Sequence, residues 1–300
     1  MWARTAQGLT QAQVATRANV SREWLNAILP CAIRRLTARY GGGMPERLLA
    51  PEGAAVDLGE FEHGGATLVY EDFGTGPRPI VLLHGIGMGR SVYIDLIQRL
   101  TQRGGHRVIG IDLPGFGEAP EPVRTLTMER HADLVAAYLQ SRGIADAVVL
   151  GHSMGTQIAV EVAVRHPDVV SALILAGPTV NSAARSIRAQ AGYLLRDLVG
   201  ERPVVLWRGA REYLRGGPHL FRKMRATIVH EPEKAYPRVQ VPALVVRGQR
   251  DPLAPMTWCR EIVDAMPDAR FEEIPDHGHG TIISDSGAAA ETISAFIDAL

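Results

Sequence analysis

The sequence of 300 residues contains only two cysteines, Cys31 and Cys259, far apart in the chain. This spacing fits neither a disulfide framework nor a set of thiolate metal ligands, so we expect a reducing, cytoplasmic compartment. No run of about 18 apolar residues is present, which argues against a membrane-spanning helix. The N-terminus lacks an apolar segment behind a basic start, which argues against a secretory signal.

The sequence also lacks an excess of charge of either sign and a cofactor-binding motif. The 32 Lys and Arg residues balance 32 Asp and Glu residues, so the chain as a whole has no electrostatic reason to bind nucleic acid or an anionic membrane. No Gly-x-x-x-x-Gly-Lys phosphate loop occurs, and no spacing suggests a metal site, so we expect neither a cofactor nor a metal. The apolar fraction of 46% is that of an ordinary globular protein with a sizeable core.

One stretch carries a strong chemical signal. An apolar run at residues 148–150 is followed at once by Gly151-His152-Ser153-Met154-Gly155 and then by an amphipathic run at residues 156–166. This order predicts a buried strand, a tight turn and a helix, with glycines that let strand and helix approach closely. A serine at the tip has a strained backbone and lies at a helix N-terminus, where developing negative charge is favoured. Ser153 is therefore the predicted nucleophile.

The rest of the chain alternates between short apolar strands and helices, which predicts an α/β fold with a mostly parallel, doubly wound sheet. A hairpin is expected at residues 56–73. Further strands are expected at 79–83, 107–111, 147–150, 172–176, 241–248 and 270–274, and helices at 91–103, 128–141, 156–166, 256–266 and 288–300. Between residues 179 and 240 the alternation stops, and three helices are expected at 193–199, 204–213 and 221–229. We interpret this insertion as a helical lid over the carboxyl edge of the sheet, where ligands bind in such folds.

The first 50 residues differ from the remainder. Residues 9–28 read as two short helices, with a capping box at Thr10 and Gln13 and an N-cap at Ser21. The stretch resembles the helix-turn-helix of repressor-type DNA-binding domains but is too short for an independent module. The predicted division is a helical extension at 1–50, a core at 51–178 and 241–300, and a lid at 179–240.

Five short motifs follow one another along the chain, with the serine motif before the Asp251 motif and the His279 motif last. They are His84-Gly85-Ile86-Gly87, Asp112-Leu113-Pro114-Gly115-Phe116-Gly117, the Ser153 pentapeptide, Gly248-Gln249-Arg250-Asp251 and Gly278-His279. With them, residues 56–300 resemble the α/β-hydrolase fold family in its lidded form. The resemblance implies a catalytic triad in which Ser153 attacks, His279 acts as base and Asp251 orients the base.

Two of these roles have rival residues nearby in the sequence. His277 lies two residues from His279, but the family places the base directly after a glycine. Asp276 is close to the base in sequence, yet a neighbour in the same loop rarely reaches the far ring nitrogen. Asp112 is read as structural, holding the turn at Gly115 and Gly117. A serine at position 153 excludes the relatives that use an aspartate nucleophile.

The resemblance also implies an oxyanion hole made by the backbone N–H groups of Ile86 and Met154. Six side chains could line an apolar acyl pocket or simply pack: Met88, Tyr193, Trp207, Tyr213, Phe221 and Trp258. The predicted lid is rich in Arg and Lys, which could attract an anionic substrate or form solvated helix faces.

The leading hypothesis is a serine hydrolase that cleaves a small-molecule carboxylic ester or thioester through an acyl-enzyme. One alternative keeps the triad but cleaves a carbon–carbon bond or transfers the acyl group to another acceptor. A second alternative is a hydrolase-like ligand sensor whose N-terminus binds DNA. Oligomeric state is not predicted.

Overall fold

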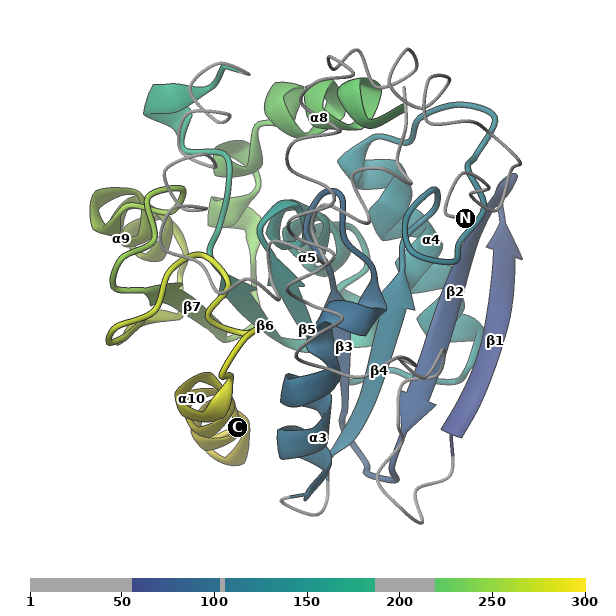
Figure 1. Cartoon of the computed structure of the whole chain (residues 1–300), viewed down its shortest axis with the longest axis horizontal. Helices are drawn as coiled ribbons and strands as arrows, with labels where there is room; N and C mark the ends of the chain where they lie inside the picture. Colours follow the sequence, from purple (N-terminus) through teal and green to yellow (C-terminus); the bar gives the residue numbers. More distant parts are fainter. Residues whose placement is uncertain (1–55, 103–105, 187–218) are drawn as a thin grey trace, which may run out of the picture.

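The computed structural model describes residues 56–102, 106–186 and 219–300. In these residues a sheet of eight strands runs through the molecule, with helices on both faces (Figure 1). The strands are β1 (Val56–His63), β2 (Ala66–Phe73), β3 (Pro79–Leu83), β4 (Arg107–Asp112), β5 (Ala147–His152), β6 (Val170–Ala176), β7 (Ala243–Gly248) and β8 (Ala269–Ile274). The α-helices are α3 (Ile94–Gln102), α4 (Met128–Ser141), α5 (Met154–Arg165), α8 (His219–Val229), α9 (Met256–Ala265) and α10 (Gly287–Asp298). Short 3-10 turns are η1 (Arg90–Tyr93), η2 (Pro167–Val169), η3 (Ser182–Ala184), η4 (Pro232–Lys234) and η5 (Tyr236–Arg238).

The strand order in the sheet is β1-β2-β4-β3-β5-β6-β7-β8. The hairpin of β1 and β2 is antiparallel, and β2 also pairs antiparallel with β4. All the remaining pairs are parallel. The carboxyl ends of the parallel strands therefore meet at one edge of the sheet, and β5 ends near its centre.

Two apolar layers hold the helices against this sheet. Alternate residues of one strand point to opposite faces, so Val81 packs in one cluster with α4, α5 and α9, while Leu82 packs in the other with α3 and α10. Most of these strand side chains are buried, which explains why they read as continuous apolar runs. The α/β fold class predicted from the sequence is confirmed.

Most element bounds agree with the predicted ones, and two helices begin differently. The helix expected at residues 91–103 begins as the 3-10 turn η1, where Val92 N donates to Gly89 O at 3.1 Å. The helix expected from residue 156 begins at Met154, directly after Ser153. The first turn of this helix lies so close to β3 that a Cβ on Gly155 would be 2.1 Å from the carbonyl oxygen of Leu83, so only glycine fits at position 155.

The segment between β6 and β7 is described in part. Its described residues form η3, α8, η4 and η5 and contain no strand. On α8, Lys223 donates to the carbonyl oxygen of Gly115 at 2.5 Å and pairs with Glu121 at 2.6 Å, so α8 lies against the loop that follows β4 (Figure 1). The helices predicted at 193–199 and 204–213, and all of residues 1–50, lie outside the described residues.

Candidate active site

Ser153 lies at the tip of a sharp turn between β5 and α5. Its backbone has φ 53° and ψ −118°, a conformation that residues other than glycine rarely adopt. Its N–H donates to the carbonyl oxygen of Ala176 at 3.0 Å, which ties the turn to the end of β6. The loop after β3 packs against the turn, since a Cβ on Gly85 would lie 3.1 Å from the Cβ of Ser153. The serine is thus 8% exposed and held at the carboxyl edge of the sheet.

Asp251 and His279 meet through their side chains although 28 residues separate them. Nδ1 of His279 lies 2.8 Å from Oδ2 of Asp251, and both side chains are buried. Gly177, at the end of β6, lies against both, because a Cβ there would be 3.0 Å from the His279 ring and 3.2 Å from Asp251 Oδ2. Glycine is required at this position for space and for its φ of +55°.

The second carboxylate oxygen of Asp251 is held by backbone donors. Oδ1 accepts from Leu253 N at 2.8 Å and from Ala254 N at 3.1 Å, so the carboxyl group cannot rotate freely. Burial alone would raise the pKa of Asp251, but the imidazole of His279 and these two N–H groups outweigh it and hold the pKa below its usual value. The carboxylate stays ionised and oriented toward the imidazole.

Two further side chains link the Ser153 turn to its surroundings. His152 is fully buried, its Nε2 lies 2.9 Å from the carbonyl oxygen of His279, and the two rings are 4.9 Å apart. Burial lowers the pKa of His152 to about 3, so the neutral ring donates from Nε2 to that carbonyl. On the other side, Oγ of Ser153 lies 3.4 Å from Oγ1 of Thr179. These contacts bring the turn, the end of β6 and the His279 loop to one place.

The loop after β3, which carries Ile86, is anchored from both of its ends. His84 is fully buried; its Nε2 accepts from Leu113 N at 3.1 Å, and its Nδ1 donates to Gly85 O at 2.8 Å. Arg90, which is 7% exposed, pairs with Glu71 at 3.1 Å, with Glu118 at 2.7 Å and with Asp112. The N–H of Met154, at the first turn of α5, belongs to the helix amides that lack an intrahelical acceptor.

The residues weighed as rivals lie elsewhere. His277 is half-buried and bonds the backbone, with Nδ1 2.7 Å from Pro275 O and Nε2 3.3 Å from Asp285 O. Asp276 has an exposed side chain paired with Arg250 at 3.4 Å. Asp112 accepts from Glu118 N at 2.9 Å just after the Gly117 turn, in keeping with its predicted structural role.

The side chains proposed for an acyl pocket have different surroundings. Met88 is half-buried, and its sulfur faces Gly85. Trp258 is buried in the core, where its indole N–H donates to Pro178 O at 3.2 Å. Phe221 is 60% exposed on α8, so we do not retain it as a lining residue. Tyr193, Trp207 and Tyr213 lie outside the described residues.

Three basic side chains in the described part of the predicted lid pair with carboxylates. Besides Lys223 with Glu121, Arg185 pairs with both carboxylate oxygens of Glu233 at 2.7 Å, and Lys234 pairs with Glu231. These three cations are therefore balanced by neighbouring carboxylates, which favours a structural role over attraction of an anion.

Several residues of the site region were not singled out from the sequence. Gln157 is fully buried and donates from Nε2 to the carbonyl oxygen of Thr179 at 2.8 Å. The same side chain reaches His230, whose Nδ1 lies 3.1 Å from Gln157 Oε1. The sequence signal for Gln157 is that it and Glu161, one turn further along, are polar residues in the largely apolar helix that follows Ser153. Thr179 and His230 give no local signal, because their partners are distant in sequence.

Three buried histidines lead to a prediction for acid stability. Burial lowers the pKa of His84, and it lowers the pKa values of His131 and His152 to about 3. Because the unfolded chain binds these protons near pH 6.5 and the folded chain does not, the free energy of unfolding should fall as the pH drops from about 6.5 toward about 3. The loss approaches about 1.4 kcal/mol per pH unit for each histidine. Urea unfolding followed by tryptophan fluorescence between pH 7.5 and 5, above most carboxyl titrations, measures this slope.

His131→Leu provides the control for that slope. It removes one titrating group from the buried face of α4, where Nδ1 of His131 has no hydrogen-bond partner among the described residues. The variant should lose stability less steeply below pH 6.5 than the wild-type chain does. Equal slopes for the two proteins would contradict the assignment of His131 as a buried neutral group.

A family model described as "alpha/beta hydrolase fold" matches residues 78–205, and a second, described as "TAP-like protein", matches residues 222–299. The chain belongs to the α/β-hydrolase superfamily. Neither match reaches the first 50 residues, so the helix-turn-helix resemblance receives no support.

Relatives of this hydrolase include an "AB hydrolase superfamily protein" (YisY) from Bacillus subtilis, 25% identical over 77% of this chain and 95% of the relative. A pimeloyl-[acyl-carrier protein] methyl ester esterase from Chromobacterium violaceum is 28% identical over 72% of this chain and 92% of the relative. Other relatives are named as hydrolases of carbamates and of dienedioates. The solved esterase from Exiguobacterium antarcticum has the same fold, with a TM-score of 0.67 at 20% identity over 78% of this chain and 96% of that one. The chain is therefore a hydrolase of the α/β fold. No helix within the described ranges is long and apolar enough to cross a bilayer.

Proposed function

We propose that this hydrolase cleaves a carboxylic ester or thioester by way of a covalent acyl-enzyme on Ser153. The observation that carries the proposal is the buried hydrogen bond of 2.8 Å between His279 and Asp251 at the sheet edge where the Ser153 turn lies. A serine hydroxyl is a weak nucleophile at neutral pH and needs such an oriented base to remove its proton.

In the first half of the reaction, His279 takes the proton of Ser153 while Oγ bonds to the carbonyl carbon of the substrate. The carbonyl oxygen becomes an oxyanion, and the N–H groups of Ile86 and Met154 donate to it. His279, now an imidazolium held by Asp251, returns the proton to the departing alcohol or thiol. The acyl group remains on Ser153.

In the second half, His279 removes a proton from a water molecule, whose oxygen attacks the acyl carbon. The same two N–H groups stabilise the second oxyanion. His279 then protonates Oγ of Ser153, which releases the carboxylic acid and restores the enzyme. The scheme uses no cofactor.

The substrate class is inferred from relatives and chemistry together. The Chromobacterium violaceum relative is named for a methyl ester on a carrier-bound acyl chain, and this supports an ester substrate. We propose that residues 179–240 form a lid that shapes the acyl pocket. The sulfur of Met88 faces Gly85, which packs against Ser153, so Met88 remains a candidate lining residue. The cytoplasmic location stays a prediction.

Carbon–carbon hydrolysis is the second candidate. The same serine, base and oxyanion donors would serve it, and a relative from Burkholderia vietnamiensis named as a dienedioate hydrolase is 26% identical over 70% of this chain. The ligand-sensor hypothesis depends on residues 1–50 and gains no support from the described residues.

A fluorophosphonate probe tests the proposal, because it phosphonylates only an activated serine. Digestion and mass spectrometry should locate the adduct on Ser153. A panel of p-nitrophenyl esters of increasing chain length, matched thioesters and a hydroxy-oxo-dienedioate then ranks the substrate classes by kcat/KM. An adduct on another residue would refute the mechanism, and preference for the dienedioate would favour the second candidate. Transfer to added alcohol, seen as a new ester product, would indicate acyltransferase activity.

A further inference from the structure

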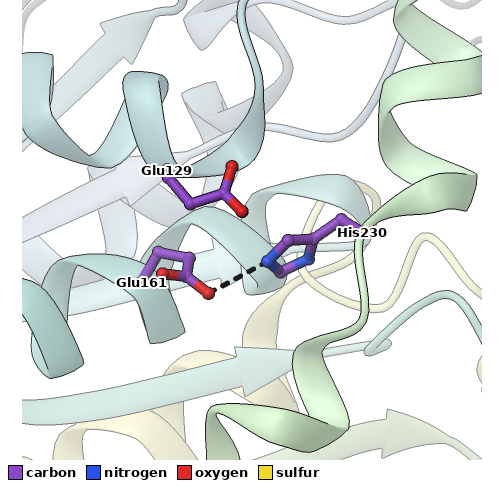
Figure 2. Close-up of side chains that lie close together, drawn as sticks. All are labelled: Glu129, Glu161 and His230. Atoms are coloured by element: carbon purple, nitrogen blue, oxygen red, sulfur yellow. Dashed lines mark hydrogen bonds and ion pairs between the residues drawn. The ribbon is translucent and has the colours of Figure 1, made fainter.

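A cluster of three titratable side chains lies apart from the proposed triad. Glu129 from α4, Glu161 from α5 and His230, directly after α8, point toward one another (Figure 2). One ligand-capable atom of each lies within 4.8 Å of the other two. Glu161 and the His230 side chain are buried, while Glu129 is half-buried and gives the cluster a path to solvent.

The hydrogen bonds of His230 determine which ring nitrogen faces the carboxylates. The amide nitrogen of Gln157 donates to Thr179 O, so its amide oxygen is the atom that faces His230 Nδ1 at 3.1 Å. Nδ1 must therefore carry a hydrogen. Nε2 points to Oε1 of Glu161 at 3.0 Å. A histidine ligand that donates its other N–H to a fixed carbonyl oxygen is typical of metal sites.

The charge of the cluster also favours a bound cation. Two carboxylates face one imidazole, so the cluster carries net negative charge even when His230 is protonated, and buried negative charge is costly unless it is balanced. Burial would raise the pKa of Glu129, but a hydrogen bond from Thr127, its own backbone N–H and the charges of His230 and Arg165 hold it below its usual value, so this charge is balanced only in part. The neighbouring arginines are held by other carboxylates, Arg165 by Asp133 at 2.9 Å and Arg185 by Glu233 at 2.7 Å. A divalent cation beside a neutral imidazole would make the cluster neutral.

We propose that Glu129, Glu161 and His230 form a binding site for a divalent transition-metal ion of the Zn²⁺ type. Imidazole and carboxylate ligands suit such ions, whereas Mg²⁺ and Ca²⁺ prefer oxygen ligands alone. Bonds of about 2.0–2.2 Å to a tetrahedral ion place ligand atoms about 3.4 Å apart. Atoms that are now up to 4.8 Å apart must therefore approach by up to about 1.4 Å, a shift that the half-buried Glu129 can make. Water would complete the coordination.

The site would join three segments that are distant in sequence. It would fix the chain just after α8 to the α4 and α5 helices of the core. A line of contacts runs from His230 through Gln157 to Thr179, whose Oγ1 lies 3.4 Å from Oγ of Ser153. The ion would thus be a structural tie beside the proposed active site, and its binding does not depend on the proposed reaction.

Metal titration of the full chain tests this inference. After EDTA treatment and dialysis, Zn²⁺ is titrated against a chromogenic chelator, and Co²⁺ is used as a second probe whose visible absorption reports tetrahedral coordination. We expect one tightly bound ion per chain, a rise in Tm with Zn²⁺ and none with Mg²⁺. Glu129→Gln and His230→Gln should each weaken binding by at least about tenfold.

His166→Gln is the matched control, because His166, directly after the C-terminus of α5, forms a comparable pair with Asp133 at 2.8 Å that includes no residue of the cluster. It should leave Zn²⁺ affinity unchanged. Glu129→Gln keeps the Glu161–His230 pair, so the variant is expected to fold, which circular dichroism verifies. Equal Zn²⁺ binding by the wild type and Glu129→Gln would assign the ion to surface histidines. No Zn²⁺ binding by the wild type would mean that the cluster is only an ion pair between Glu161 and His230. Either result overturns the proposal.

Discussion

Replacing Ser153 by alanine is expected to lower kcat by about 10⁶-fold and to abolish fluorophosphonate labelling. The variant lacks the oxygen that forms the acyl-enzyme, while the backbone donors and the His279–Asp251 pair remain in place. Residual turnover would come from substrate binding and oxyanion stabilisation alone. Initial rates on the best ester of the panel, with active-site titration of the wild type, measure the ratio.

Two companion variants separate chemistry from folding. Ser171→Ala removes an exposed hydroxyl, which donates to Asp146 O at 2.7 Å, and should change neither rate nor labelling. Ser153→Gly should be inactive yet more stable than the wild type by about 1 kcal/mol or more, because glycine tolerates a φ of 53°. Full labelling of Ser153→Ala would assign the nucleophile elsewhere.

Replacing Asp251 by asparagine is expected to lower kcat by about 10⁴-fold with little change in KM. Leu253 N and Ala254 N donate to Oδ1, so the asparagine carbonyl oxygen will occupy that position. The NH₂ group must then face Nδ1 of His279 and donate to it. This forces the ring hydrogen onto Nε2, where the ring can no longer accept the proton of the serine.

The control for this variant is Asp276→Asn, in the same loop as His279 but with an exposed side chain. Its activity should match that of the wild type. If Asp276→Asn were impaired as strongly as Asp251→Asn, or if Asp251→Asn were nearly fully active, Asp251 would not be the residue that orients the base.

Several features could be predicted because their causes are local. Residues 79–83 form a strand and residues 128–141 a helix at the predicted bounds, since each follows from one short pattern. Thr127 caps α4 by accepting from Arg130 N at 3.3 Å. The turn at Ser153 is predictable for the same reason: glycines at 151 and 155 leave room for a close approach that a Cβ would block.

Other features could not be foreseen because their partners are far apart in sequence. Arg90 forms ion pairs with three carboxylates, which lie on β2, at the end of β4 and in the loop after β4. The cluster of Glu129, Glu161 and His230 was not expected, since no metal-ligand spacing relates these positions. The residue type of Phe221 suits either a pocket or plain packing, and only the orientation of α8 shows that it is exposed.

The sequence by itself determined the order of strands and helices, the α/β class and the sharp turn at residue 153, because backbone sterics and hydrophobic period act over a few residues. Only the tertiary structure decided which side of α8 faces the core, which atoms of Asp251 and His279 meet, and that two glutamates and His230 converge. Those outcomes depend on strand order and helix packing, which bring together residues whose separation in the chain carries no information about their distance in space.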